Sequence, residues 1–232
     1  MFLTCHKPNS YQLRAYVYQA RDLLAGDSNG LSDPFARIIF LNQSQATEKL
    51  EKTLCPTWDQ SLIYERIDIH GDPEVVVANP PKITIEVFDH DTFGEAEFLG
   101  RTFAYPMVKL DPSDSHTPVL QWYSIKKGQQ YGGELLAAFE LLLVDEEALL
   151  FKTVPELMNG KELPFLPPKR GKIFQVPSGI RPILQRTAIE VMSWGVRNMR
   201  KFQLSSVTSP SIEFEVGGHM VQSKTIRNTK RN

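Results

Sequence analysis

Residues 82–100 of the chain read Lys-Ile-Thr-Ile-Glu-Val-Phe-Asp-His-Asp-Thr-Phe-Gly-Glu-Ala-Glu-Phe-Leu-Gly. Residues 82–88 alternate apolar and polar side chains, which is the period of a β-strand with one buried face. Residues 89–97 form a polar, acidic loop, and residues 98–103 resume an apolar pattern. The stretch therefore predicts two strands joined by an acidic loop.

The same alternation extends outward from this stretch in both directions. Further strands are predicted at residues 11–18, 34–41, 47–54, 61–69, 119–125 and 133–143. About eight short strands between residues 10 and 145 favour an antiparallel β-sandwich. The last segment is rich in Leu and Ala and could equally form a helix. Its weak alternation behind Gly132 and Gly133 favours a strand.

The rest of the chain divides into three parts. Residues 1–9 are an N-terminal extension, and prolines recur without any period through residues 146–182, which predicts an extended linker rather than a packed segment. Strand patterns return in the final part, at residues 187–194, 211–216 and 220–226. Three strands are too few for a sandwich, so we interpret residues 183–232 as the truncated start of a second β-domain.

Composition limits the function. The 232 residues are 41% hydrophobic with a net charge of −1, so a globular core is expected and the bulk charge indicates no nucleic-acid partner. The start resembles no signal peptide, and the longest apolar stretch, residues 135–144, is far shorter than the ~20 residues of a membrane span. No Gly-x-Ser-x-Gly motif or Gly-rich phosphate loop is present, so we expect no enzyme and no small-molecule substrate.

Two acidic loops carry the chemistry, at residues 26–34 and 89–97. Their candidate metal ligands are Asp27, Asp33, Asp89, Asp91 and Glu97. Carboxylates of this number repel one another unless a cation lies among them, and Ca²⁺ takes six to eight oxygen ligands. Asp, Gly and Asn are also ordinary turn residues, but two loops of the same composition favour an ion site. An EF-hand is excluded because its twelfth position would be Gly100 instead of Glu.

Both loops resemble the calcium-binding loops of C2 domains. The first matches in Asp27, five residues, then Asp33-Pro-Phe. The other matches in Asp89-x-Asp91, five residues, then Glu97-Phe-Leu-Gly. The resemblance implies an eight-stranded C2-type sandwich at residues 10–145, with the permuted strand order in which the first strand becomes the last. It implies the five carboxylates as Ca²⁺ ligands, with Glu97 where the family usually has Asp.

Other segments resemble the ferlins, with a lean to the otoferlin and fer-1-like branch. They are residues 53–60, Thr-Leu-Cys-Pro-Thr-Trp-Asp-Gln, residues 185–191, Gln-Arg-Thr-Ala-Ile-Glu-Val, and residues 194–199, Trp-Gly-Val-Arg-Asn-Met. The ferlin resemblance implies one central C2 domain and the start of the next. It also implies a cytoplasmic, peripheral location at membranes and vesicles, with a role in vesicle fusion or membrane repair.

From these features we expect a Ca²⁺-dependent module that binds anionic phospholipid membranes, with fusion-machinery proteins as further partners. Phe93 and Leu31, near the loop tips, are the candidate membrane-inserting side chains. A Ca²⁺-independent protein-interaction scaffold is the alternative. Residues 198–211, at the first-loop position of the second domain, contain no Asp or Glu, so that loop is expected not to bind the ion.

Overall fold

The computed structural model describes residues 8–91, 94–111, 114–144, 173–183, 185, 187–201, 206–216 and 219–227. The chain forms two compact units, residues 1–182 and 183–232. The elements of the first unit are β1 (Asn9–Arg21), β2 (Pro34–Phe40), β3 (Gln43–Ala46), β4 (Thr57–Ile69), α1 (Pro73–Ala78), β5 (Ile83–Asp89), β6 (Glu97–Ala104), β7 (Met107–Lys109), β8 (Gln121–Lys127) and β9 (Gln130–Leu143). No helix in the described residues is long and apolar enough to cross a membrane.

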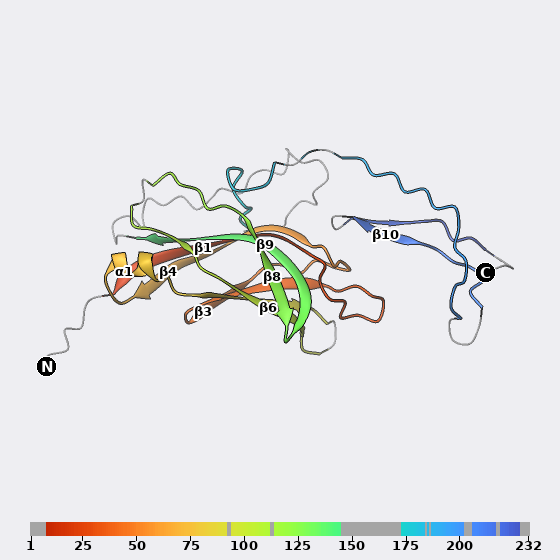
Figure 1. Ribbon diagram of the computed structural model, residues 1–232, viewed down its shortest axis with the longest axis horizontal. Helices are drawn as coiled ribbons and strands as arrows, with labels where there is room; N and C mark the ends of the chain where they lie inside the picture. Colours follow the sequence, from red (N-terminus) through yellow and green to blue (C-terminus); the bar gives the residue numbers. More distant parts are fainter. Residues whose placement is uncertain are drawn as a thin grey trace. The chain divides into compact units, whose positions relative to one another are not determined.

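Eight strands of the first unit follow the order β3-β2-β5-β6-β8-β9-β1-β4, and every neighbouring pair is antiparallel. Only one register pair, Arg101 with Lys126, joins β6 to β8, so the path folds into two layers of four strands (Figure 1). The short strand β7 runs parallel to β9. Since β1 lies between β9 and β4, the predicted eight-stranded antiparallel sandwich with a permuted order is confirmed.

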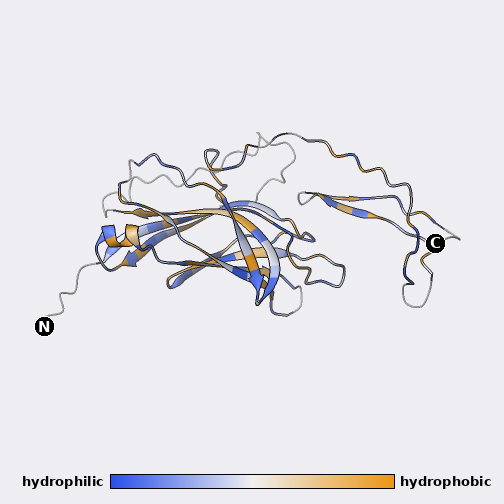
Figure 2. Cartoon of the chain, in the orientation of Figure 1, coloured by the Kyte–Doolittle hydropathy of each residue, from blue (hydrophilic) through white to orange (hydrophobic). Residues whose placement is uncertain are grey.

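The core between the layers follows from the alternation of side chains. On β1, Leu13, Ala15 and Val17 are fully buried, and they pack with inward residues of β5 such as Ile83 and Ile85. Apolar and polar residues alternate along these strands (Figure 2). Because successive side chains of a strand point to opposite faces, this spacing places one apolar row inside.

The predicted strand at residues 47–54 is wrong, and the third strand is β3 instead. A two-residue turn with Leu41 at a positive φ of 51° returns the chain immediately after β2. The polar sequence of β3, Gln-Ser-Gln-Ala, carries little strand signal. Residues 47–54 bond to the loop end of the sandwich, where the Thr53 N–H donates to the Ser32 carbonyl at 2.8 Å.

Both faces of β9 are buried, which explains why its sequence reads like a helix. Leu135 and Ala137 lie in the main core, whereas Leu136 and Ala138 belong to a second cluster on the outer face. That outer cluster also holds Tyr16 and Tyr18 of β1, and it is completed by Val176. A strand covered on both sides needs no polar row, so its apolar run is continuous.

The cover over this outer face is the strap, defined here as residues 173–182. It was expected to be part of an extended linker, but in the structure Val176 is fully buried and Arg181 is half-buried. Asp59 of β4 holds the strap: its carboxylate accepts from the Val176 N–H at 3.2 Å and contacts the Arg181 guanidinium at 3.4 Å. The Ser61 N–H adds a bond to the Phe174 carbonyl at 2.7 Å. Residues 146–172 lie outside the described part.

The second unit contains one described hairpin, formed by β10 (Glu213–Val216) and β11 (His219–Gln222). These strands match two of the predicted segments. The third prediction, a strand at residues 187–194, is wrong for this structure: the segment has no strand assignment, and Ile189 and Trp194 are exposed. A strand requires a hydrogen-bonded neighbour, and no described residues of this unit pair with it.

The second unit repeats the hydrogen bonds of the first at a constant offset of 176 residues. Hairpin pairs Arg37–Ala46 and Phe40–Gln43 correspond to Glu213–Gln222 and Val216–His219. The N–H bonds Thr47 to Ala36 and Leu50 to Pro34 correspond to Ser223 to Ile212 and Ile226 to Pro210, at 2.9, 3.1, 2.8 and 3.1 Å respectively. Even the unusual positive φ of Asp22, 55°, recurs at Asn198 with 59°.

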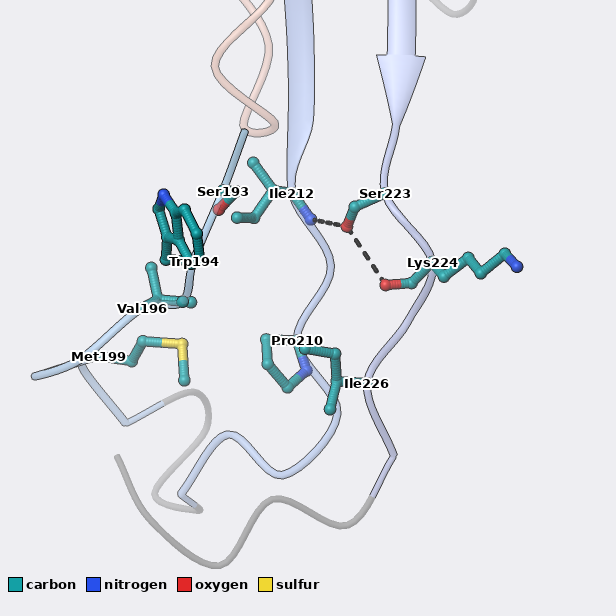
Figure 3. Close-up of a pocket in the computed structure, with 10 residues that line it drawn as sticks. Ser193, Trp194, Val196, Met199, Pro210, Ile212, Ser223, Lys224 and Ile226 are labelled. Carbon is teal, nitrogen blue, oxygen red and sulfur yellow. Dashed lines mark hydrogen bonds between the residues drawn. The ribbon is translucent and has the colours of Figure 1, made fainter. Parts of the chain in front are cut away.

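A cavity of about 230 Å³ lies beside this second hairpin (Figure 3). Trp194, Val196 and Met199 line one side, and Pro210 and Ile226 line the other. In the first unit the counterpart of Pro210 is Pro34, whose carbonyl accepts the indole N–H of buried Trp58 at 3.3 Å. One wall of the cavity thus contains the counterpart of a proline that contacts a tryptophan in the first unit.

Candidate functional site

The two acidic loops meet at one end of the sandwich. The first connects β1 to β2, and the other connects β5 to β6. Because β2 and β5 are antiparallel neighbours, with Pro34 paired to Asp89, the end of the first loop lies against the start of the other. Glu97 pairs with Asp89 across the next ladder.

Asp89 is the centre of this end. The residue is 1% exposed, and its Oδ1 accepts the Asp33 N–H at 2.6 Å, which ties the two loops together. The His90 N–H donates to the Asp33 carbonyl at 3.1 Å and closes the contact from the other side. Within the described residues Oδ2 of Asp89 is buried without a hydrogen-bond partner. An unpaired carboxylate oxygen at a buried position is costly unless something cationic approaches it.

The electrostatics of the loop end also favour a cation beside Asp89. Burial raises the pKa of Asp89, and the nearby charges of Asp27 and Asp91 raise that pKa further. Interactions with the Asp33 N–H and the Ser32 hydroxyl lower the pKa of Asp89. Asp27 and Asp91 are therefore close enough to Asp89 for mutual repulsion, as the sequence predicts for a cation site.

Ser32 and Gly26 shape the first loop, and the sequence analysis did not single out Ser32. The buried Ser32 hydroxyl donates to the Leu24 carbonyl and accepts the Gly26 N–H, both at 2.9 Å. A Cβ on residue 26 would collide with Oδ2 of Asp89, so a larger residue there would force the Asp89 side chain to move. Sequence reasoning could have found Ser32 because it directly precedes Asp33, a predicted ligand.

Asp33 is held by residues of the segment that follows β3. Oδ1 accepts the Lys52 backbone N–H at 2.7 Å, and Oδ2 lies 3.9 Å from the Lys49 ammonium. The Arg37 side chain instead pairs with Glu86 at 2.7 Å. The side chains of Arg37 and Lys49 thus both face carboxylates.

Glu97 points to a different partner. Its Oε1 lies 2.8 Å from the ammonium of Lys127, the last residue of β8. Among the described residues, no group of three or more His, Cys, Asp or Glu side chains is arranged closely enough to hold a metal. The five predicted ligands share one end of the fold, but their side chains do not converge on one point.

The structure describes one of the two candidate membrane-inserting residues. Leu31 is half-buried, and its carbonyl accepts the Asp27 N–H at 3.0 Å, so it closes a tight turn. Phe93 lies outside the described residues. His90 is exposed and contributes its backbone to the contact between the loops.

The residues present suit Ca²⁺ in donor chemistry. The set is all oxygen, which Ca²⁺ prefers, and Oδ2 of Asp89 is a buried acceptor without a partner among the described residues. Asp33 and Asp89 would hold the ion at the junction of the loops, with Asp27 and Asp91 completing its carboxylate ligands. Ca²⁺ would supply positive charge and open coordination positions for a further oxygen ligand.

The comparisons with known proteins place the chain. The C2 domain family model matches residues 11–125, so the sandwich is a C2 domain. The chain is 46% identical to myoferlin of Xenopus tropicalis over 98% of its length, 46% to human myoferlin over 95%, and 40% to mouse Fer-1-like protein 4 over 96%. It belongs to the ferlin family. The predicted lean to the otoferlin branch stays a prediction.

The chain spans about a tenth of the length of these relatives, between 10% and 11% of each. Among solved structures, a single C2 domain of plant Extended Synaptotagmin 1 is 20% identical, with a TM-score of 0.47, and it matches 61% of this chain and all of its own. The calcium-bound pair of C2 domains of Extended-Synaptotagmin 2 is 21% identical, with a TM-score of 0.45, over 60% of this chain and 48% of its own.

Proposed function

We propose that the loop end of the sandwich binds Ca²⁺ through Asp27, Asp33, Asp89, Asp91 and Glu97, and through the ion binds anionic phospholipid membranes. The observation that carries this proposal is the buried Oδ2 of Asp89, which has no hydrogen-bond partner in the described residues while Asp27 and Asp91 lie within electrostatic range. The domain acts by binding and performs no catalysis.

The mechanism is a reversal of local charge. Without the ion, the loop end carries up to five negative charges and repels a surface of anionic lipid. Two Ca²⁺ ions would cancel most of that charge, and lipid phosphate or carboxylate oxygens would complete their coordination. The backbone carbonyls of Gly26, His90 and Glu95 are the further protein ligands that we propose.

Insertion of loop-tip side chains would add to this attraction. Burial of one Phe side chain contributes about 1.5–3 kcal/mol, so Phe93→Ala should weaken binding to anionic vesicles about tenfold or more. Leu31 is half-buried and its side chain is smaller than that of a Phe, so the main insertion is assigned to Phe93.

The test is a calorimetric Ca²⁺ titration of the full chain beside the Asp89→Asn, Asp91→Asn double variant. We expect heat of binding in the parent and none in the variant. The matched control is Glu65→Gln with Glu74→Gln, which removes the same charge from exposed positions away from the acidic loops and should bind Ca²⁺ like the parent. Sedimentation with phosphatidylserine vesicles, with and without Ca²⁺, then tests the membrane step.

A parent chain that melts cooperatively but takes up no Ca²⁺ would contradict the proposal. The Ca²⁺-independent interaction scaffold would then be the better function. Variants that unfold are recognised by their melts, so loss of binding is counted only in a folded protein.

For the longer family members, we propose a cytoplasmic, peripheral position of this domain at membranes and vesicles, and a role in vesicle fusion or membrane repair. Fusion-machinery proteins are the proposed further partners; no nucleic acid is expected. The proposal rests on membership of the ferlin family, shown by identities of 40–46%.

We also propose that residues 183–232 are the opening of a second C2-like domain. The constant offset of 176 residues supports this, since bonds and register recur together. At the same offset, Asp27 and Asp33 correspond to Gln203 and Ser209 in the sequence. The first loop of this second copy therefore lacks the carboxylates that Ca²⁺ needs.

A further inference from the structure

Lys127 forms an ion pair with Glu97, one of the five predicted ligands. Glu97 is the first residue of β6 and lies opposite Asp89, the last residue of β5. Residues directly opposite each other in an antiparallel pair have Cβ atoms about 5 Å apart, so Glu97 is within reach of the oxygens around Asp89. In the structure its carboxylate instead lies 2.8 Å from the Lys127 ammonium.

The ion pair between Lys127 and Glu97 is suited to being broken. Its two side chains are 37% and 46% exposed, so water screens the attraction and either group can leave without burying an unpaired charge. By contrast, the Lys109–Glu140 pair at the same distance of 2.8 Å is 8% and 5% exposed and belongs to the interior. Removing a partner from such a buried pair is far more costly.

We propose that Lys127 is a resident cation that competes with Ca²⁺ for Glu97 and, once released, binds the phosphate of an anionic lipid. This inference rests on the proposed function. Without the ion, Lys127 neutralises Glu97 and leaves four carboxylates at the loop end. When Ca²⁺ binds, Glu97 turns to the ion and the freed ammonium faces outward at the end of β8, beside the acidic loops.

The proposal predicts opposite effects of one substitution on two measurements. In Lys127→Gln, the Ca²⁺ dissociation constant should fall about two- to fivefold, because an exposed ion pair no longer has to be broken. At saturating Ca²⁺, binding of the same variant to phosphatidylserine vesicles should weaken about fivefold, since one lysine near an anionic surface is lost. A lysine with a structural role alone would not raise the affinity for Ca²⁺ and lower the affinity for vesicles when it is replaced.

Lys126→Gln is the matched control. Lys126 is exposed, its register partners are Arg101 and Tyr131, and its side chain leaves the opposite face of β8. It carries the same charge one residue away, but the ammonium that pairs with Glu97 is that of Lys127. We expect Lys126→Gln to keep the Ca²⁺ dissociation constant of the wild type, about two- to fivefold above that of Lys127→Gln.

The full chain is titrated with Ca²⁺ by calorimetry as wild type, each lysine variant, Glu97→Gln, and the Lys127→Gln, Glu97→Gln double variant. Competition requires that Lys127→Gln tightens binding in the wild type and does nothing in the Glu97→Gln background. Equal effects of the two lysine variants, or an effect that persists without Glu97, overturn this proposal alone. A wild-type chain that binds no Ca²⁺ overturns the proposed function as well.

Discussion

At the scale of single residues, the loop end depends on how closely the chain approaches Asp89. Gly26 and Asp89 come from loops far apart in sequence, and the space between them has no room for a methyl group. The acidic spacing in the sequence predicted two loops at one end of the fold, but not that Glu97 pairs with Lys127 or that Ser32 anchors the first loop. Those contacts depend on side-chain directions that no period in the sequence encodes.

Gly26→Ala should lower the free energy of unfolding by about 1–3 kcal/mol and weaken Ca²⁺ binding, because the new Cβ collides with Oδ2 of Asp89. Urea unfolding and calorimetry measure both effects. Gly179→Ala is the control, since a Cβ there meets nothing within 4 Å. Equal stabilities of the two variants would show that the loop relaxes without cost.

Asp89 should make the stability of the Ca²⁺-free protein fall as pH rises. Burial raises its pKa above the ordinary value of 3.8, so ionisation costs more in the folded state than in the unfolded state. The stability of the wild type relative to Asp89→Asn should therefore decrease from pH 3.8 upward through the raised pKa. Ca²⁺, which binds the ionised form, should recover the loss at about pH 7. Melts of both proteins across this range, with and without Ca²⁺, measure the effect; a pH-independent difference would contradict it.

At the scale of elements, periodicity predicted strands that have one polar face and failed where both faces are covered or where pairing is absent. The strands β1, β2, β4, β5, β6 and β8 were recognised from alternation or propensity. β9 was ambiguous because the strap buries its outer face. Residues 187–194 have the pattern of a strand but no neighbour within the described residues of their unit, so the pattern is not realised.

The strap is expected to contribute stability through the Asp59 carboxylate. Asp59 has a positive φ of 46°, which Asn tolerates equally, so Asp59→Asn tests the charge without straining the backbone. We expect a loss of about 1.5–3 kcal/mol in urea unfolding and faster proteolysis within residues 173–182. Asp22→Asn is the control, because Asp22 has φ of 55° and is exposed. If both variants unfold alike, the strap is not held by this carboxylate.

At the scale of the whole molecule, the sequence predicted one sandwich followed by part of another β-domain, and the ferlin resemblance implied that this part opens a second C2 domain. The offset of 176 residues adds the register and the hydrogen bonds that the two parts share. The repeat is detected from register and hydrogen bonds, since few side chains are shared between residues 11–50 and 187–226. The packing of residues 173–182 was likewise not predicted, because proline-containing segments read as linkers whether or not they pack.

A fragment of residues 8–182 should bind Ca²⁺ with the stoichiometry of the full chain and melt at the same temperature. The first unit contains all five predicted ligands and the strap, and the corresponding loop of the second unit lacks carboxylates. Calorimetry and thermal melts of the two proteins measure this. Extra Ca²⁺ bound by the full chain would contradict the proposal that residues 183–232 do not bind the ion.

The strap also has a mechanical consequence. The strap forms hydrogen bonds to Asp59 and Ser61 of β4, whereas the chain leaves the sandwich from a different strand, β9. Tension applied to the chain beyond residue 182 is thus transmitted into the sandwich through β4 and loads the Asp59 contacts first. Because the force does not act directly on the end of β9, we expect this strand to stay paired in the sheet when the chain beyond residue 182 is pulled.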